Sequence, residues 1–448
     1  SAVSIDAVKK FIAEQDLKAE HRYVPDIVVA SNLGRWKEKI AIIGAGPAGL
    51  SCAYYLAQMG YYPTVFEKNE RAGGMLTYGI PSYKLEKNVI DAEIEIMKEM
   101  GVEIKLGVEV GKDVTIPQLR EQGYKAFYLA IGCQGGRLPN IPGQDAIGVT
   151  TAVEFLKHAN AGKEKTEGEI VVVGGGNVAI DAARVSARSG SSKVTMLCLE
   201  TEDIMPASKE EIKEAREDGV VINCGWGPKE VVVENGKATA IVFKKCTRVY
   251  DENNKFSPLY DENETITIPA DKVIFAIGQS IIWGNLLDGS NVELGRGNGP
   301  VADGYTFQTS QEDIFTGGDV LTGPKFAIDA IAQGHEAAES LHRYVQNGHM
   351  TIGRDPRRFI QFDTSDIKVE NYATILHVKK QQMVLKNHSV MSMEHLQKNK
   401  LRRKHLVALV VVQLLSMITV VSVAAYVQQD VNLMLLLSIV IIQKQVQW

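Results

Sequence analysis

Two glycine-rich turns, each between an apolar strand and a helix, constrain the fold of this chain more than any other feature. The first lies in residues 39–50, KIAIIGAGPAGL. Its Ile-rich start is typical of a buried parallel strand, and residues 50–60 have an apolar spacing compatible with a helix. The turn between them consists of Gly44, Ala45, Gly46, Pro47, Ala48 and Gly49.

This turn has the G-x-G-x-x-G spacing that binds the pyrophosphate of a dinucleotide. Gly44 permits the tight turn, Gly46 lets the backbone approach a phosphate, and Gly49 lets the helix pack closely on the strand. The phosphate would lie on free N–H groups at the positive end of the helix. Residues 62–66 are predicted to form the next strand, which ends at Glu67. An acidic residue at this position binds a ribose hydroxyl in dinucleotide-binding units. The alternative is a glycine-rich turn in an ordinary α/β domain.

A pair of adjacent glycines follows this acid. Gly73 and Gly74 interrupt residues 69–81, NERAGGMLTYGIP, and a double glycine is a poor interior for a helix or a strand. Its position favours backbone close to a cofactor. A surface turn is the alternative.

The strand, turn and helix recur in residues 169–180, EIVVVGGGNVAI. Gly174 and Gly176 occupy the first two glycine positions, and Ala179, an accepted small residue, takes the third. The strand predicted over residues 193–199 ends at Glu200. Two such units in one chain predict two dinucleotide sites.

Glu200 also predicts which nicotinamide nucleotide binds the second unit. A carboxylate accepts a hydrogen bond from a ribose 2′-OH but repels a 2′-phosphate, and neither Leu199 nor Thr201 is basic. We therefore expect NADH rather than NADPH. A solvent-facing glutamate at a strand end is the alternative interpretation.

Later segments repeat the first ones. Residues 126–132, AFYLAIG, and residues 272–278, KVIFAIG, are both predicted strands that end in glycine, the second at Gly278. Residues 313–319, DIFTGGD, predict a strand followed by Gly318 and Asp319, with a long helix from residue 324 onward. Residues 231–268 predict an antiparallel hairpin insert. These repeated segments favour an α/β fold that contains two copies of one architecture.

Composition excludes several functions. A net charge of −5 over 448 residues gives no basic surface for nucleic acid. The five cysteines are scattered without a C-x-x-C pair, which favours a reducing, cytoplasmic setting and argues against a redox disulfide centre. The first thirty residues lack the apolar segment of a signal peptide. We expect a helical N-terminal remnant over residues 1–35.

The ordered motifs GAGPAGL, FEKNERAGGMLTYGIP, VVVGGGNVAIDAAR, MPASKEEI, AIGQ and DIFTGGDV resemble those of the flavoprotein small (beta) subunit of glutamate synthase. They are also similar to the flavin part of dihydropyrimidine dehydrogenase, a relative within the pyridine nucleotide–disulfide oxidoreductases. The resemblance implies two Rossmann-like, three-layer domains, with the NAD(P) domain at residues 156–285 inserted in an FAD domain made of residues 36–155 and 286–350. A connector would cover residues 351–372.

The same resemblance implies the site residues. The implied FAD contacts are Gly44, Gly46, Gly49, Glu67, Gly74, Leu76 and Asp319, with Gly318 beside them. The implied nicotinamide nucleotide contacts are Gly174, Gly176, Asn177, Ala179 and Glu200, with Gly278 nearby. Hydride would pass from NADH (or NADPH) to FAD, a step that needs close stacking rather than an acid or base, so no catalytic side chain and no metal ligand is named.

Electrons would then leave for an iron–sulfur centre or a partner subunit. Full-length members of this family carry [4Fe–4S] clusters, but this chain has no ligand set for one. Two alternatives to the main function are a membrane-tethered NADH dehydrogenase and a non-catalytic flavoprotein subunit.

The tail, residues 373–448, differs in character from the rest. No glycine follows Gly353, and residues 406–427 are an uncharged run of transmembrane length after a basic cluster. One interpretation is a membrane anchor. The one that we favour is a shifted reading frame, because shifted codons permit cysteine at Val421, Ala424, Val427 and Val431, the C-x₂-C-x₂-C-x₃-C spacing of an iron–sulfur site.

Overall fold

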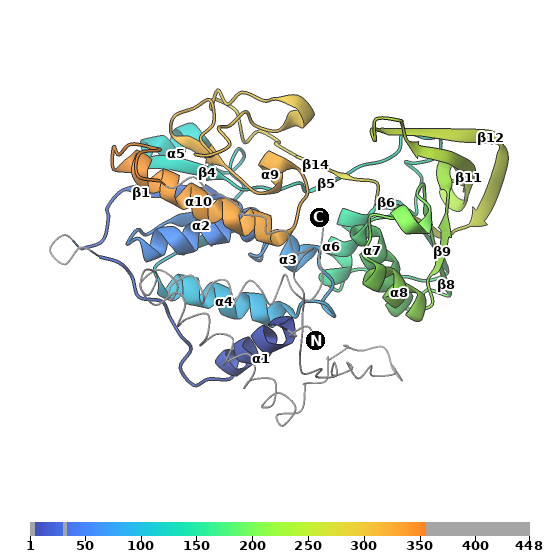
Figure 1. Cartoon of the computed structure of the whole chain (residues 1–448), viewed down its shortest axis with the longest axis horizontal. Helices are drawn as coiled ribbons and strands as arrows, with labels where there is room; N and C mark the ends of the chain where they lie inside the picture. The colour runs from blue at the N-terminus through green and yellow to red at the C-terminus, as the bar shows by residue number, and fades with distance from the viewer. Residues whose placement is uncertain (1–4, 30–33, 355–448) are drawn as a thin grey trace, which may run out of the picture.

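Two five-stranded parallel sheets form the framework of the chain. The computed structural model describes residues 5–29 and 34–354 (Figure 1). The first sheet has the order β15–β4–β1–β2–β3. Its strands are β1 (Lys39–Ile43), β2 (Thr64–Glu67), β3 (Glu103–Leu106), β4 (Tyr124–Leu129) and β15 (Ile314–Thr316).

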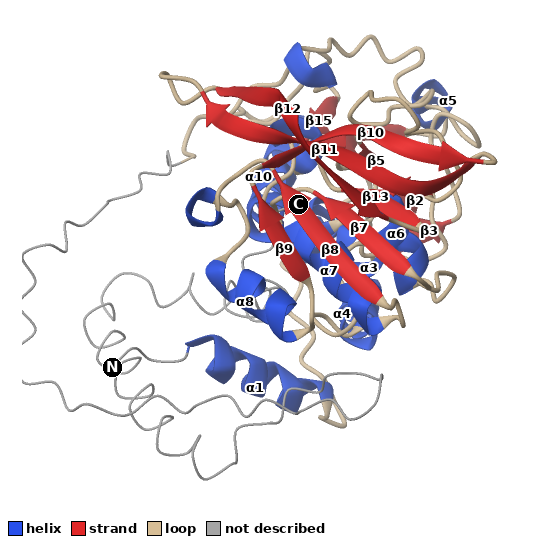
Figure 2. Ribbon diagram, turned by 90° about the vertical axis from the view of Figure 1, so that its right-hand side faces the viewer, coloured by secondary structure: helices blue, strands red, loops and turns tan. Residues whose placement is uncertain are grey.

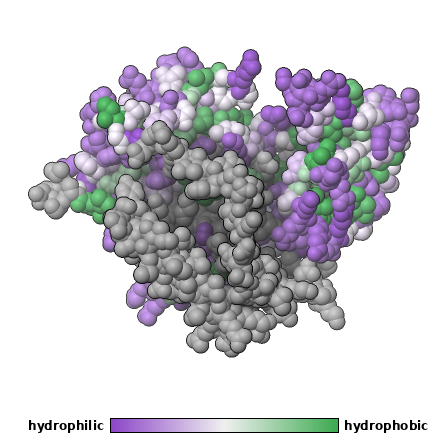
Figure 3. Space-filling view, viewed as in Figure 1, coloured by the Kyte–Doolittle hydropathy of each residue, from purple (hydrophilic) through white to green (hydrophobic). Residues whose placement is uncertain are grey.

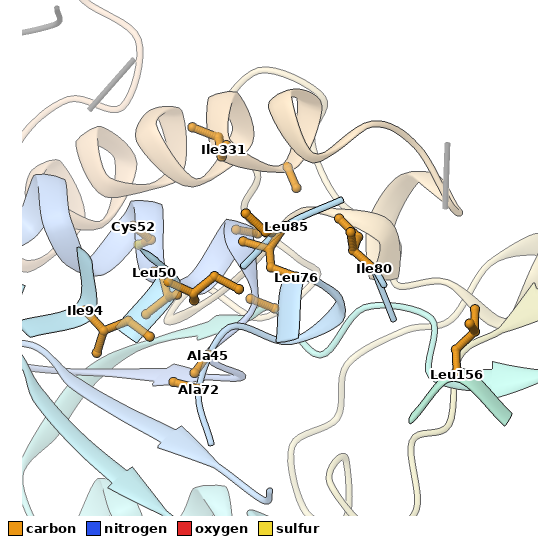
Figure 4. Close-up of a cluster of buried hydrophobic side chains, with 14 of the residues drawn as sticks. Ala45, Leu50, Cys52, Ala72, Leu76, Ile80, Leu85, Ile94, Leu156 and Ile331 are labelled. Carbon is orange, nitrogen blue, oxygen red and sulfur yellow. The ribbon is translucent and has the colours of Figure 1, made fainter. Parts of the chain in front are cut away.

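Helices cover one face of this first sheet. They are α2 (Pro47–Gln58), α4 (Lys87–Glu99) and α10 (Ala327–Val345). Their buried side chains share one core with the inward residues of β1 and β4, such as Ile42 and Tyr128. Figure 4 shows Leu50 and Cys52 of α2 lying beneath the helix that carries Ile331. The other face packs on α5 (Ile116–Glu121) and on the segment around Leu286.

The second sheet has the order β6–β13–β7–β8–β9, again all parallel. Its strands are β6 (Val149–Thr151), β7 (Glu169–Val173), β8 (Lys193–Cys198), β9 (Val221–Cys224) and β13 (Lys272–Phe275). One face packs on α6 (Ala152–Asn160), α7 (Asn177–Arg188) and α8 (Lys209–Glu217). All five strands lie between β4 and β15 in the sequence. The expected two-unit α/β fold, with one unit inserted in the other, is therefore confirmed.

An antiparallel sheet covers the opposite face of the second parallel sheet (Figure 2). It contains three strands, β10 (Trp226–Glu234), β11 (Lys237–Tyr250) and β12 (Phe256–Pro269), rather than the single hairpin that the sequence predicted. Ile241 and Phe243 of β11 pack on the parallel sheet. The visible face of this lobe is mostly hydrophilic (Figure 3).

The boundary that the sequence predicted at residue 156 is wrong, because it falls inside α6. The second sheet already begins at β6, which pairs with β13 through Val149 and Val273. The units are also joined by a ribbon of two short antiparallel strands, β5 (Gly135–Gly136) and β14 (Gln279–Ser280).

The remaining elements are short or terminal. They are α1 (Ile5–Leu17), α3 (Met75–Tyr78), α9 (Asp319–Thr322) and the 3-10 turns η1 (Glu202–Ile204) and η2 (Arg296–Asn298). Within the described ranges, no helix is long and apolar enough to cross a bilayer. Both interpretations of the tail, and most of the predicted connector, concern residues outside the described part of the chain.

Candidate functional site

The first glycine turn joins β1 to α2 at the carboxyl edge of the first sheet. Gly44 has a φ of +105°, and a Cβ there would lie 2.5 Å from the carbonyl oxygen of Ala130. A Cβ on Gly49 would lie 1.9 Å from the carbonyl oxygen of Gly44. Packing within the protein therefore demands glycine at both positions.

Gly46 differs from its two neighbours in the motif. It has ordinary extended backbone, with φ −80° and ψ −177°, and a Cβ there would meet only the Cα of Gly74, at 3.9 Å. Packing within the protein leaves room for a side chain at this position. Gly46 lines a cavity, so a group in that cavity would have direct access to its backbone.

Glu67 ends β2 and is buried. Its Oε2 accepts a hydrogen bond from the N–H of Ala45 at 2.9 Å. Its Oε1 accepts from the N–H of Asn69 at 2.9 Å and from the Asn69 side-chain amide at 2.6 Å. A carboxylate offers about four acceptor sites, so these bonds fix the side chain at the cavity wall and leave capacity for a ligand hydroxyl.

Asp319, the first residue of α9, lines the same cavity as Glu67. Burial raises its pKa to about 7, although its Oδ1 accepts a hydrogen bond from the N–H of Lys325 at 3.2 Å. Gly318 before it has a φ of +75°, and a Cβ there would lie 2.9 Å from the Cβ of Ala48. This close approach brings the DIFTGGD segment onto the amino-terminal end of α2.

The first cavity encloses about 1060 Å³, part of it open to solvent, which suits a ligand of dinucleotide size. Nine of the residues predicted from the sequence line it. They are Gly44, Gly46, Pro47, Ala48, Glu67, Gly74, Leu76, Gly318 and Asp319. Ala45 and Gly49 lie in the turn but outside this lining, where Ala45 bonds to Glu67 and Gly49 packs on the turn.

The second glycine turn repeats the geometry of the first. A Cβ on Gly174 would lie 2.4 Å from the carbonyl oxygen of Ala276, just as one on Gly44 meets Ala130. Gly176 has ordinary extended backbone, with φ −91° and ψ 174°, and a Cβ there would meet no atom within 4 Å. In this motif too, the middle glycine is the one at which the fold leaves room for a Cβ.

The side chains around this second turn hold it in place. Asn177 Oδ1 accepts a hydrogen bond from the N–H of Ser208 at 3.0 Å, and Ala179 is fully buried. The Glu200 carboxylate lies over the turn, where a Cβ on Gly175 would be 2.7 Å from its Oε2. Burial raises the pKa of Glu200.

A second cavity of about 940 Å³ opens at the amino-terminal end of α7. Gly176, Asn177 and Gly278 line it, whereas Gly174, Ala179 and Glu200 stand behind or beside the turn. Arg137 and Gln279 line it too, and sequence reasoning missed both. The sequence gave no signal for Arg137, and the one for Gln279 was its place in AIGQ, directly after a predicted strand.

The two cavities share a wall. Pro324 lines the second cavity and Lys325 lines the first. Residues in and beside the ribbon of β5 and β14 also divide between the cavities. Gln134 and Ile282, which flank the ribbon, line the first cavity, whereas Arg137 beside β5 and Gln279 of β14 line the second. The two cavities therefore approach each other at residues 324–325 and beside the ribbon.

In the described part of the chain, the Sγ atoms of Cys198 and Cys224 lie 3.8 Å apart as free thiols at the ends of β8 and β9. No group of His, Cys, Asp and Glu within the described ranges could hold a metal ion. Cys133 donates a hydrogen bond from Sγ to the carbonyl oxygen of Asp319 at 3.2 Å, and burial raises its pKa to about 12. Its thiol therefore stays protonated and unreactive at neutral pH.

The sequence pattern of the family described as pyridine nucleotide-disulphide oxidoreductase matches residues 38–334. The glutamate synthase (NADPH) small chain of Halomonas elongata is 36% identical over 358 residues, which cover 77% of this chain and 75% of that one. The Escherichia coli glutamate synthase (NADPH) small chain is 35% identical with the same coverage. These matches confirm the resemblance that the motifs indicated.

A larger relative, the NADP(+)-dependent formate dehydrogenase subunit beta of Moorella thermoacetica, is 36% identical over 77% of this chain. The chain spans only about half of that protein, 52% of its length. Among solved structures, FprA from Mycobacterium tuberculosis shares the fold with a TM-score of 0.60 at 19% identity, covering 70% of this chain and 85% of FprA.

Proposed function

Because the chain belongs to the pyridine nucleotide-disulphide oxidoreductase family, we propose that it oxidises NADH with bound FAD and passes the electrons to an iron–sulfur centre or a partner subunit. The observation that carries the proposal is the wall between the two cavities, formed by Pro324 on one side and Lys325 on the other. Two dinucleotide cavities that meet end to end suit a transfer between two stacked rings.

The first cavity suits FAD. Gly46 and the amino-terminal end of α2 would face its pyrophosphate, and Glu67 has acceptor capacity for a ribose hydroxyl. Asp319 and the start of α10 would hold its other half, since Ala327 and Ala330 line the same cavity. FAD supplies a ring that accepts hydride and releases electrons one at a time.

The second cavity suits the nicotinamide nucleotide, with Gly176 and Asn177 at the amino-terminal end of α7 facing the pyrophosphate. Glu200 would lie on the side of this turn that faces the adenine ribose of the nucleotide. The chain's own residues bind, orient and exclude water at both cavities, and none is needed to move a proton. We therefore name no catalytic side chain.

NADH is preferred over NADPH in this proposal because acids crowd the end of β8. Glu200 is followed by Glu202 and Asp203, and the nearby Arg216 is already paired with both Glu202 oxygens at 2.7 and 2.6 Å. A 2′-phosphate would meet negative charge here without a free guanidinium to bind it. The two glutamate synthase small chains above are named for NADPH, so in this proposal the chain differs from them in nucleotide preference.

The electron acceptor is the least specified part of the proposal. Relatives are named as subunits, such as the formate dehydrogenase subunit beta, and the chain spans half of that protein. This supports transfer to a partner subunit or to an iron–sulfur centre, which the described residues do not themselves ligate.

The two middle glycines allow a direct test. Gly46→Ala and Gly176→Ala add one Cβ in space that the fold leaves open, so both variants should fold as the wild type does. We expect Gly46→Ala to lose FAD affinity by at least about tenfold and Gly176→Ala to lose NADH affinity alone, measured by calorimetric titration.

Gly49→Ala is the comparison variant, because its Cβ would overlap the carbonyl oxygen of Gly44 and should lower the free energy of unfolding, which the two variants above should leave unchanged. Variants at 46 and 176 that fold normally and keep both affinities would contradict the proposal.

A further inference from the structure

The side-chain amide of Gln279 is buried and has no hydrogen-bond partner among the described residues. The residue is 8% exposed, and neither its Nε2 nor its Oε1 bonds to the protein. Folded proteins satisfy the large majority of buried polar side-chain atoms, so an amide left with both ends unpaired calls for a physical reason.

The sheet order places Gln279 on a definite side of the second turn. In the second sheet β7 lies between β13 and β8. Glu200 follows β8, and Gln279 follows β13 through Gly278. A dinucleotide lies across the carboxyl edge with its adenine ribose at the acid and its other half on the far side of the phosphate turn. Gln279 therefore stands on the side of the nicotinamide.

The ribbon brings the same residue to the shared wall. Gln279 is the first residue of β14, where it pairs with Gly136 of β5. Gln279 lines the second cavity, and Ile282, three residues on, lines the first. The ring that has to approach the first cavity would thus lie next to this residue.

Chemistry separates Gln279 from the other polar side chains that line the second cavity, Arg137 and Asn177. A guanidinium offers donors and no acceptor. The Asn177 Oδ1 already accepts from the N–H of Ser208. A primary amide with a donor and an acceptor is complementary to another primary amide, and the nicotinamide ring carries one, its carboxamide.

We propose that Gln279 is a positioning residue that hydrogen-bonds the carboxamide of the nicotinamide and so fixes the orientation of the ring at the shared wall. The inference rests on the proposed function, in which the second cavity holds NADH. Gln279 touches no reacting atom in this account. It acts by holding the ring in one orientation, and it leaves the ADP half of the nucleotide to the glycine turn.

The test compares two ligands on Gln279→Met, which keeps the length of the side chain and removes the amide. Calorimetric titration of the FAD-loaded full chain with NAD⁺ and with ADP-ribose, which lacks the nicotinamide, gives the two affinities. We expect Gln279→Met to weaken NAD⁺ binding by at least about tenfold and to leave ADP-ribose within about twofold of the wild type.

Loss of the unpaired amide has a second, independent consequence. The thermal midpoint of ligand-free Gln279→Met should equal or exceed that of the wild type, because a buried polar group without a partner is replaced by an apolar one. A midpoint that falls by more than about 4 °C would show that the fold uses the amide, and would overturn the inference.

The binding outcomes separate this inference from the proposed function. Equal weakening of both ligands, or unchanged NAD⁺ affinity, overturns the role of Gln279 and leaves the proposed function standing. A wild-type chain that binds neither ligand overturns the proposed function and the inference together.

Discussion

Single residues divide the glycine motifs into two kinds. Gly44, Gly49 and Gly174 are required by the fold, because a Cβ at each would collide with a carbonyl oxygen. Gly46 and Gly176 have ordinary φ angles and open space, so the fold itself does not require glycine there, and the proposed function assigns that requirement to bound nucleotides. The sequence motif predicted this division for Gly44, Gly46 and Gly49, and the structure adds the contacts that a Cβ would make at each position.

The proposed preference for NADH depends on single residues at the end of β8. We expect the double variant Leu199→Arg/Glu200→Arg to raise kcat/KM for NADPH relative to NADH by at least about a hundredfold, since it removes a repulsive carboxylate and adds two guanidinium groups. Steady-state kinetics with both nucleotides measures the ratio. Glu202→Gln should shift the ratio in the same direction but less, because it removes one carboxylate and releases the guanidinium of Arg216 without adding a cation. Wild-type preference for NADPH would contradict this account.

At the scale of elements, the strands and helices around both turns could be predicted because apolar runs and glycines mark them. The antiparallel sheet was harder. Its first strand, β10, starts Trp226-Gly227-Pro228, which reads as a turn, so one hairpin was expected in place of three strands. The signal was available in Asn235-Gly236, a two-residue hairpin turn with both residues at positive φ.

The wall between the cavities could not be predicted from the sequence. It is built from residues 132–137, 278–283 and 319–325, which lie far apart in the chain and meet through the pairing of β5 with β14. No local pattern encodes a contact between a two-residue strand and another of the same length. Gln279 was missed for this reason.

The packing of α10 on α2 depends on one further glycine. A Cβ on Gly334 would lie 2.3 Å from the carbonyl oxygen of Ala48 and 2.9 Å from the Cβ of Ser51. We expect Gly334→Ala to lower the free energy of unfolding by about 1–3 kcal/mol through overpacking, measured by urea denaturation. Gly304→Ala meets no atom within 4 Å and should change it by less than about 0.5 kcal/mol. Equal effects of the two substitutions would refute this packing argument.

At the scale of the whole molecule, buried charges hold the two units together. Lys84, in the loop between α3 and α4 of the first unit, pairs with Asp181 of α7 and lies 2.6 Å from Glu211 of α8. All three side chains are buried. The Arg188 guanidinium lies over the neighbouring Tyr83 ring, 4.2 Å from the centroid of that ring. These contacts join the loop between α3 and α4 to α7 and α8 of the second unit.

Removing the lysine should break this connection. Lys84→Met removes the cation that pairs with Asp181 and, among the described residues, leaves Glu211 with only the more distant Arg184, 3.9 Å away, and we expect it to lower the free energy of unfolding by about 3–5 kcal/mol at pH 8. Burial already raises the pKa of Asp181 in the folded chain, and loss of Lys84 raises it further. A raised carboxyl pKa makes stability fall as the pH rises through it, so the loss should shrink toward pH 5.

Denaturation at the two pH values checks the sign of this effect. The matched control is Lys98→Met, whose exposed ammonium pairs with Glu95 on the surface. It should cost less than about 1 kcal/mol at either pH. A Lys84→Met loss that grows toward pH 5 would contradict the buried-charge account.

Hydride transfer between the two cavities depends on how the whole molecule arranges them. The most direct measurement mixes the FAD-loaded chain with NADH under anaerobic conditions and follows the visible absorbance of the flavin in a stopped-flow instrument. Stoichiometric bleaching by NADH in a single turnover, much faster than with equal NADPH, is the predicted result. A flavin that stays oxidised while NADH is bound would contradict the claim that the two sites meet for hydride transfer.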